Sequence, residues 1–364
     1  MQRRTFLQQG LTVSAGLALG AVPRFDRPAA ADDSTKWRAF EVNTKIEVAD
    51  PVGAVRLWLP VPLLTHTDYF KREGDTWTGN FKAARPVQHD RYGTGLLFAE
   101  WPASEKSPVL ELKSRFMTRD RAVDLSKKPA AALREDKAVL DHFRKPSNLI
   151  RTDGIVATTS KGITMGIKGD VDKARAIYEW IVDNTFRDPK VRGCGIGDIS
   201  TMLETGYLGG KCADLNALYV GLARAAGLAA RDVYGIRCAA SGEFKSLGKA
   251  DDITGAQHCR AEVYLGGYGW TPVDPADVRK VVLEENQPEQ LPLDDPKVKK
   301  ARTKLFGAWE MNWLPYNYGH DIRLPQSNGP ELGFLMYPQL ETANGRRDSL
   351  DPKNFRYTIS AKEL

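Results

Sequence analysis

The stretch 209–219 constrains the fold of this chain more than any other. A glycine pair, Gly209 and Gly210, is followed by Lys211 and then by a strongly helical run that begins at Cys212. A thiol at that junction lies at a helix N-terminus, where unpaired N–H groups and the helix dipole favour the thiolate over the thiol. Because the thiolate is the nucleophilic form of cysteine, the position indicates a reactive residue rather than a packing one.

Helical periodicity on either side of this junction indicates the fold class. A helix over 170–182 is predicted with Asp170 as its N-cap, because it carries a stripe at positions i, i+3, i+4 and i+7 that consists of Ala174, Ile177, Tyr178 and Ile181. The helix at Cys212 should end at Gly227, and a strand candidate follows at 231–237. Helices that precede the sheet indicate an α+β fold.

Composition changes along the chain predict three regions after the N-terminus. Residues 32–125 should form a small β-rich domain, because four short segments there are rich in Val, Leu, Phe and Trp: Trp37–Val48, Ala54–Leu59, Gly95–Trp101 and Val109–Met117. Residues 126–280 should form the core, beginning with a charged helix over 127–144. Residues 281–364 carry an aromatic cluster over 309–320 and are predicted to be an extension that packs on the core.

Residues 1–31 have the pattern of an export signal. Arg3 and Arg4 form a twin-arginine pair, a short apolar stretch runs from Leu11 to Val22, and the small residues 29–31 precede Asp32. The apolar stretch is too short for a membrane-spanning helix, and no later segment approaches the necessary length. We therefore expect a bacterial protein, carried folded across the inner membrane and periplasmic or secreted, with no membrane span after removal of the signal.

Charge and cysteine content exclude two classes of function. Removal of residues 1–31 would lower the formal net charge from +6 to +3, and the basic residues are dispersed, so a nucleic-acid-binding protein is excluded. None of the four cysteines belongs to a CxxC pair. A zinc site built from these cysteines and His258 is therefore a weak alternative, and we expect neither metal nor cofactor.

His258 and Asp274 are the candidate partners of Cys212. His258, Arg260 and Glu262 share one face of a two-period segment, and a glycine-rich turn at 266–269 leads into a second strand that ends at Asp274. Directly opposed residues of an antiparallel pair lie on the same face. His258 opposes Asp274 if the hairpin is centred on residue 266, which requires a loop of odd length.

These three residue types divide the work of nucleophilic catalysis. In this hypothesis Cys212 attacks an acyl carbon, His258 moves the proton, and Asp274 orients the imidazole and stabilises its charge. The Cys212 backbone N–H would help to hold the developing oxyanion. The sequence does not identify the second oxyanion donor, for which Asn184 and Tyr207 are only candidates.

The same residues resemble motifs of the transglutaminase-like superfamily. The Gly-Lys-Cys sequence, with the helix that follows it and ends over 224–231, looks like the nucleophile motif of this superfamily. Two later blocks look like the second half of the superfamily's motif: His258-x-x-x-Glu262-Val263-Tyr264 and Gly269-Trp270-x-Pro272-x-Asp274-Pro275. The resemblance covers about 170–280. It implies a papain-like core, with Cys212, His258 and Asp274 as the catalytic triad. The family usually carries Trp two residues after the histidine, where this chain has Arg260. The whole chain also resembles twin-arginine-exported bacterial proteins with a β-rich segment before this domain.

The sequence thus predicts an exported cysteine acyl-transfer enzyme that acts on a peptide, protein or cell-wall peptide, with hydrolysis favoured over crosslinking. Because Arg260 shares a face with His258, it is a candidate contact for a substrate carboxylate. An ion pair of Arg260 with Glu262 or a nearby aspartate is an equally open alternative. A non-catalytic binding or scaffolding module that retains the fold is the alternative from another functional class.

Overall fold

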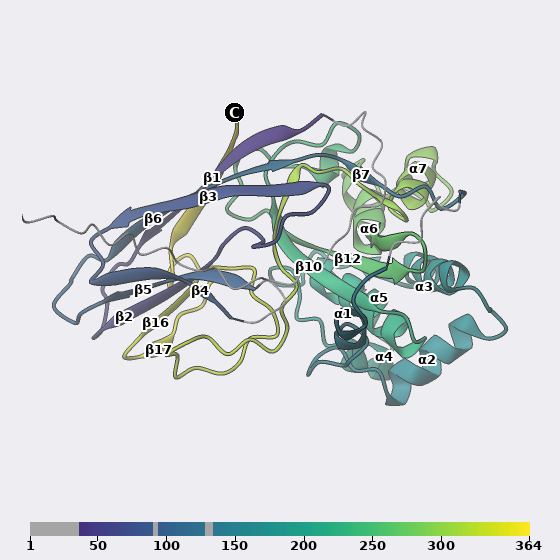
Figure 1. The fold of residues 1–364 in the computed structure, drawn as a ribbon, viewed down its shortest axis with the longest axis horizontal. Helices are drawn as coiled ribbons and strands as arrows, with labels where there is room; N and C mark the ends of the chain where they lie inside the picture. The colour runs from purple at the N-terminus through teal and green to yellow at the C-terminus, as the bar shows by residue number, and fades with distance from the viewer. Residues whose placement is uncertain (1–35, 90–93, 128–133) are drawn as a thin grey trace, which may run out of the picture.

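The protein is described here by a computed structural model that covers residues 36–89, 94–127 and 134–364. The predicted signal, residues 1–31, lies outside the described residues. The chain forms a β-sandwich that stands beside a mixed helical and sheet half (Figure 1). Within the described ranges, none of the helices combines the length and the apolar composition that a bilayer crossing requires.

Two five-stranded antiparallel sheets form the sandwich, in the orders β11-β18-β1-β6-β3 and β17-β16-β2-β5-β4. The strands from the N-terminal part of the chain are β1 (Arg38–Glu47), β2 (Val55–Pro60), β3 (Phe70–Gly79), β4 (Ala83–Gln88), β5 (Gly95–Trp101) and β6 (Val109–Thr118). In β6, Leu110, Leu112 and Phe116 alternate with solvent-facing residues and are at most 2% exposed. The four predicted strands are therefore confirmed, whereas the edge strands β3 and β4 were not predicted. β3 is mostly polar, and β4 is short, contains Pro86 and has no buried residue.

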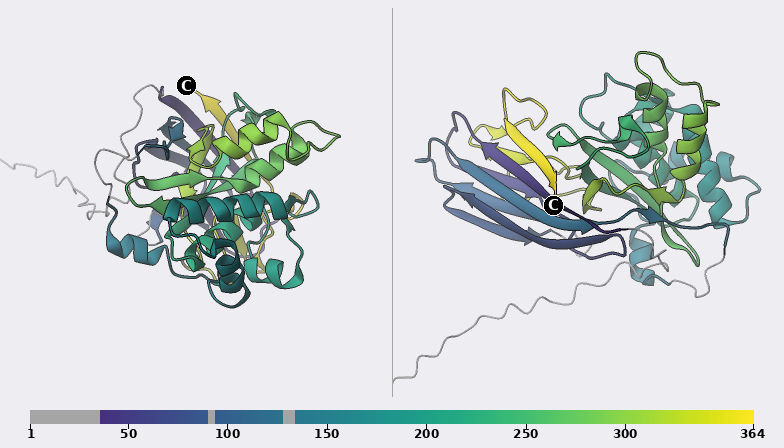
Figure 2. Two further views of the ribbon diagram at one scale, coloured as in Figure 1. Left: turned by 90° about the vertical axis from the view of Figure 1, so that its right-hand side faces the viewer. Right: turned by 90° about the horizontal axis from the view of Figure 1, so that it is seen from above.

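The C-terminal segment completes the sandwich, a role additional to the predicted packing of 281–364 on the core. β18 (Tyr357–Glu363) pairs with β1, β16 (Gln339–Thr342) pairs with β2, and β17 (Gly345–Arg346) pairs with β16. Figure 2 shows the C-terminal strand lying along the first strand of the described chain. Pairing between opposite ends of a chain leaves no local sequence pattern, so periodicity does not reveal it.

The other half consists of helices packed on a four-stranded antiparallel sheet with the order β13-β12-β10-β15. Its strands are β10 (Ala230–Arg237), β12 (Gln257–Leu265), β13 (Gly269–Val273) and β15 (Trp313–Asn317). Its principal helices are α2 (Gly154–Thr164), α3 (Asp170–Asn184), α5 (Cys212–Ala225) and α6 (Pro275–Glu284). This arrangement confirms the predicted α+β core, in which the helix that begins at Cys212 packs on an antiparallel sheet.

Helix α5 is the central element of this half. Every residue from Cys212 to Arg224 is buried, because α2, α3 and α6 cover the faces that the sheet leaves open. Ala226 is the C-cap, one residue before the predicted Gly227. Gly227 follows with a φ of +87°, and the Leu228 N–H donates to the Ala223 carbonyl at 3.0 Å. Such a left-handed glycine closes the helix before the chain enters β10.

Two local helix predictions need correction. The stripe of α3 is fully buried, but Gly169 is its N-cap, and Asp170 is its first helical residue. In 127–144, helix α1 spans only Lys137–His142, and residues 128–133 are not described. Asp136 caps α1 by accepting from the Ala138 N–H.

The aromatic cluster joins the two halves of the molecule. Trp309, Trp313 and Tyr316 belong to the same buried cluster as Phe40 and Phe116 of the sandwich. The remaining short elements are β7 (Arg121–Ala122), β8 (Phe186–Arg187), α4 (Ile199–Thr205), β9 (Gly209–Gly210), η1 (Lys245–Leu247), β11 (Asp251–Asp252), α7 (Pro296–Lys304) and β14 (Ala308–Trp309). Because β15 lies at the edge of the core sheet, these aromatic rings position that sheet against the sandwich.

Candidate active site

Cys212 is the first residue of α5, directly after the glycine strand β9 and the N-cap Lys211. Its backbone N–H has no partner within the helix because it lies in the first turn. The residue is 4% exposed and lines a cavity of about 380 Å³ together with Cys194 and His258. The predicted junction of glycine and helix is therefore present, at the wall of a cavity.

Asp214 fastens the loop 193–197 to this end of the helix. Its Oδ2 accepts from the Lys211 N–H, and its Oδ1 accepts from the Ile196 and Gly197 N–H groups, each at 2.9 Å. Gly195, with a φ of +95°, approaches so closely that a Cβ there would lie 1.9 Å from Asp214 Oδ2. The contacts hold this loop, which includes Cys194, against the start of α5.

Replacing Gly195 with alanine should destabilise the protein more than the same change at Gly206. Both glycines have positive φ, but a Cβ on Gly206 meets nothing within 4 Å. We expect Gly206→Ala to cost about 1 kcal/mol from backbone strain. Gly195→Ala should cost about 2 kcal/mol more, because the new methyl group displaces Asp214. Urea unfolding of both variants measures the difference, and equal losses would show that Asp214 does not fasten the loop.

The hairpin of β12 and β13 sets the relation between His258 and Asp274. Leu265 pairs with Gly269, so the loop spans three residues, 266–268. The odd loop length is confirmed, but the hairpin is centred on residue 267 rather than 266. If this register is continued, Arg260 lies opposite Asp274. His258 is then the diagonal neighbour of Asp274 on the same face of the sheet.

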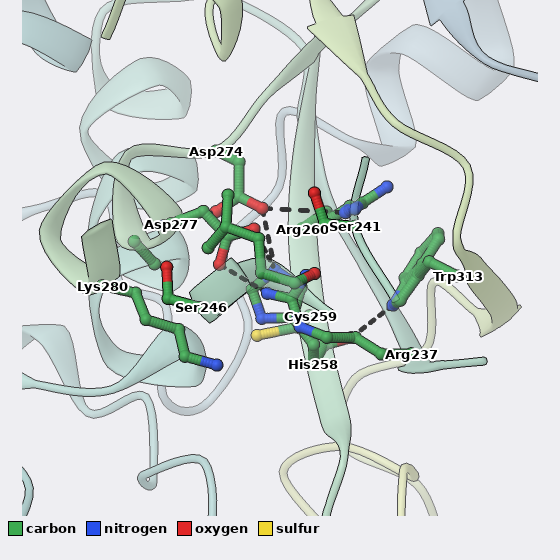
Figure 3. Close-up of polar contacts among 12 residues, drawn as sticks. Arg237, Ser241, Ser246, His258, Cys259, Arg260, Asp274, Asp277, Lys280 and Trp313 are labelled. Carbon is green, nitrogen blue, oxygen red and sulfur yellow. Dashed lines mark hydrogen bonds and ion pairs between the residues drawn. The ribbon is translucent and has the colours of Figure 1, made fainter. Parts of the chain in front are cut away.

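Asp274 joins the histidine to helix α6. Its Oδ2 lies 2.8 Å from His258 Nε2, and its Oδ1 accepts from the Asp277 N–H at 3.0 Å as the N-cap of α6 (Figure 3). The Asp274 side chain is fully buried, and the Trp313 indole donates to the His258 carbonyl at 2.9 Å. With Nε2 held by Asp274, Nδ1 is the ring nitrogen that remains for proton exchange with Cys212, which lines the same cavity.

The electrostatics of the site favour a charged pair. Hydrogen bonds to the thiols of Cys194 and Cys259, and then to His258, hold the pKa of Cys212 well below its usual range despite burial. Burial and the neighbouring Arg237 act to lower the pKa of His258, but the carboxylates of Asp277 and Asp274 outweigh them and raise it to about 9. The two shifts together favour the thiolate–imidazolium form of the pair over the neutral form.

Asp277 and Asn216 belong to this site, and the sequence reasoning missed both. Asp277 is 1% exposed, lies 3.4 Å from His258 Nε2 through its Oδ2, and accepts from Arg237 at 2.6 Å. Asn216, one turn after Cys212, donates to Asp274 Oδ1 at 3.2 Å. Their spacing could have identified them. Asp277 follows Asp274 by three residues and Asn216 follows Cys212 by four, and residues at these spacings share a helix face.

Arg260 lies behind Asp274, so the structure does not support its predicted role as a substrate contact. Its side chain is 3% exposed, and its Nε lies 3.7 Å from Asp274 Oδ2. Its guanidinium packs over the rings of Trp309 and Trp313 and donates to the Glu310 carbonyl at 3.0 Å. The contact with Asp274 corresponds to the ion-pair alternative, and it stabilises the carboxylate that holds His258.

The acidic groups around His258 also form the arrangement most like a metal site. Among the described residues, His258, Asp274 and Asp277 are the group whose ligand atoms lie within 4.8 Å of one another, and this group contains no cysteine. The alternative of a zinc site built from cysteines and His258 is therefore not assembled. Arg237 and Arg260 already face the two carboxylates, so a divalent ion would have to displace protein cations.

Gln257, rather than the earlier candidates Asn184 and Tyr207, is available as the second oxyanion donor. The Asn184 amide donates to the Trp180 carbonyl at 2.8 Å, and the Tyr207 hydroxyl donates to Asp188 at 2.7 Å, so both are engaged elsewhere. Gln257 lines the cavity and is 9% exposed. In the described part of the chain its buried Nε2 has no hydrogen-bond partner, which leaves a donor available in the wall of the cavity that Cys212 also lines.

Comparison with known proteins shows the class to which this fold and site belong. Residues 157–275, which contain Cys212, His258 and Asp274, match the sequence model of the Transglutaminase-like superfamily. An uncharacterized protein of Haemophilus influenzae is 34% identical over 360 aligned residues, which cover 91% of this chain and 93% of that protein. The chain therefore belongs to the Transglutaminase-like superfamily.

A solved structure shares the fold along most of the chain. It is the crystal structure of a "putative cysteine protease" from Cytophaga hutchinsonii, with a TM-score of 0.50 and 16% sequence identity. The similarity covers 90% of this chain and 98% of that one. Both the β-sandwich and the transglutaminase-like core therefore fall within a known architecture.

Proposed function

We propose that this chain is an exported cysteine acyl-transfer enzyme in which Cys212, His258 and Asp274 form the catalytic triad. One observation carries the proposal: Cys212, the first residue of α5, lines the same cavity as His258, whose Nε2 lies 2.8 Å from a fully buried carboxylate. This cavity has a volume of about 380 Å³, so a substrate can approach the Cys212 sulfur.

The reaction proceeds in two steps through a thioester. The Cys212 thiolate attacks the acyl carbon, and the His258 imidazolium gives its proton to the leaving amine as the carbon–nitrogen bond breaks. His258 then takes a proton from the incoming acceptor, which attacks the thioester and releases the thiolate. Asp274 holds the imidazole in position and stabilises its positive charge throughout.

Gln257 supplies the second oxyanion donor in this mechanism, beside the backbone N–H of Cys212. We expect Gln257→Ala to lower kcat by about 10²- to 10³-fold with little change in KM, the usual cost of losing one such donor. Asn184→Ala is the matched control, because that amide bonds the backbone of its own helix. Steady-state kinetics decide the matter: equal activity of the two variants would remove Gln257 from the mechanism.

Water is the acceptor that we favour, which makes the protein a peptidase or amidase acting on peptide, protein or cell-wall peptide bonds. Water needs no dedicated binding site, whereas a crosslinking transglutaminase must also bind an amine. The product masses from peptides incubated with and without an amine donor distinguish hydrolysis from crosslinking. A non-catalytic binding module, the remaining alternative, would release neither product.

Alkylation of Cys212 tests for the thiolate directly. An ordinary thiol with a pKa near 8.5 reacts roughly 80-fold more slowly at pH 6 than at pH 8, because its thiolate fraction falls. We expect the rate of Cys212 with iodoacetamide to differ less than about threefold between these pH values, since its pKa is held low and His258 stays protonated to about pH 9. Cys212→Ser should leave only slow labelling. An 80-fold fall for the wild type would contradict the charged pair.

Export through the twin-arginine route is the remaining part of the proposal, and it rests on the pattern of residues 1–31. The exported protein should begin at Asp32, which N-terminal sequencing checks. Retention of the uncleaved chain in the cytoplasm would contradict export.

A further inference from the structure

The cavity beside Cys212 has a strongly one-sided charge. Its charged lining side chains, apart from the reacting groups, are all cations: Arg187, Lys211, Arg237, Lys249 and Lys280. No aspartate or glutamate belongs to the described lining. Low-dielectric walls that carry charge of a single sign concentrate the field inside a cleft and attract ligands of the opposite charge.

Protein carboxylates neutralise only part of this charge. Asp277 accepts from Arg237 at 2.6 Å, and Glu284 is shared between Arg187 and Lys280, with Lys280 Nζ at 3.6 Å. Three cations therefore have two carboxylates between them. Lys211 and Lys249 have no ion-pair partner in the described part of the chain, so an excess of positive charge faces the cavity.

Lys280 is a largely buried cation of the cavity lining. It lies one turn after Asp277 on α6, its side chain is 18% exposed, and Figure 3 shows it on the helix that Asp274 begins. Burial lowers its pKa, and the neighbouring charge of Arg237 lowers it further. A carboxylate bound here would relieve the repulsion between the two cations, which a neutral ligand does not do.

Arg187 brings a second cation to the same place. β8 and β9 pair in parallel with Arg187 beside Gly210, two residues before Cys212. The shared carboxylate of Glu284 links Arg187 to Lys280. These two cations are therefore fixed on one side of the cavity that contains the nucleophile. Glu284 neutralises only one of their two positive charges, so the pair can bind a further carboxylate.

We propose that Lys280 and Arg187 select acyl donors that carry a carboxylate near the scissile bond. The inference rests on the proposed acyl-transfer function, whose substrate class it specifies. The carboxylate can be the C-terminus of a peptide or an acidic side chain, and both offer the same two oxygen atoms to the cavity. The role that the sequence suggested for Arg260 thus passes to residues that line the cavity.

Binding to Cys212→Ala tests this selection without requiring turnover. The probes are fluorescent tetrapeptides in two matched pairs: a free against an amidated C-terminus, and an internal glutamate against glutamine. We expect the preferred acidic member to bind at least about tenfold more tightly than its neutral partner, with the preference weakening as salt rises. The pair that shows the preference identifies the source of the carboxylate.

Adding Lys280→Gln to Cys212→Ala should reduce the preference to below about threefold, because the acidic peptides lose affinity. Lys161→Gln is the matched control, because Lys161 is an exposed lysine of α2 that does not line the cavity. Equal affinity for both members of each pair, or a preference that survives Lys280→Gln, would overturn the selection by charge. Failure of the wild type to form an acyl-enzyme would instead overturn the proposed function, so the two failures are distinguishable.

Discussion

Cys212→Ala should lower kcat/KM by about 10⁴-fold or more, which corresponds to about 5.5 kcal/mol of lost transition-state stabilisation. The loss is large because the thioester forms on this sulfur and no neighbour can replace it. Cys194 lies nearby, but its hydrogen bond to Cys212 and its burial raise its pKa well above the usual value, so it stays a thiol. Initial rates on a peptide library measure the effect.

The fold should survive this substitution, which keeps the test interpretable. Alanine is a good helix former at the start of α5, and the loop that covers this end is held by Asp214 rather than by the thiol. Cys238→Ala is the matched control, because that free, buried cysteine lies in another hydrophobic cluster. Residual activity of Cys212→Ala within tenfold of the Cys238→Ala variant would place the nucleophile elsewhere.

Asp274→Asn should lower kcat by about 10³- to 10⁴-fold. Asparagine keeps the N-cap of α6, but its amide no longer stabilises the imidazolium and can donate to Nε2, which would favour the wrong tautomer. The expected defect is therefore in the proton transfer, with the fold retained. Circular dichroism checks the fold, and steady-state kinetics measure the loss.

Asp277→Asn is the matched comparison, because this carboxylate acts on His258 through charge at 3.4 Å rather than through the shorter hydrogen bond. Asp277 raises the pKa of His258, so its removal should lower that pKa from about 9. The imidazolium would then be lost at lower pH, and the alkaline limb of the pH profile of kcat/KM should move down. Losses of the same size in both variants, with no shift of that limb, would contradict the division of roles.

The parts of this protein that follow local rules could be predicted from sequence. Three patterns are local: the glycine pair at 209–210, the helical run after Cys212 and the two-residue period of β12. They correctly predicted the thiol at the start of a helix and the imidazole on a strand. The sequence permitted an odd loop between His258 and Asp274 but did not force one, because the choice among glycine turns depends on packing. The loop is odd, and its centre lies at residue 267 rather than at 266, where His258 would directly oppose Asp274.

Long-range contacts account for what the sequence did not reveal. The pairing of β18 with β1 joins opposite ends of the chain, and neither strand carries a mark of its partner. The surroundings of Arg260 depend on Trp309 and Trp313, which lie about 50 residues further along the chain and stack on its guanidinium. A charged residue on the face of His258 therefore became a buried support for Asp274, which only the tertiary structure shows.

The central claim is that an acyl group is carried on the Cys212 sulfur. The most direct measurement mixes the full-length mature protein with a peptide library, quenches with acid within milliseconds to seconds, and locates the mass adduct by peptide mapping. The account predicts a hydroxylamine-labile acyl adduct on the peptide that contains Cys212, absent from Cys212→Ala and strongly reduced in Asp274→Asn. Peptide cleavage or transfer that proceeds without an adduct on Cys212, or the absence of both adduct and product across the library, would contradict it.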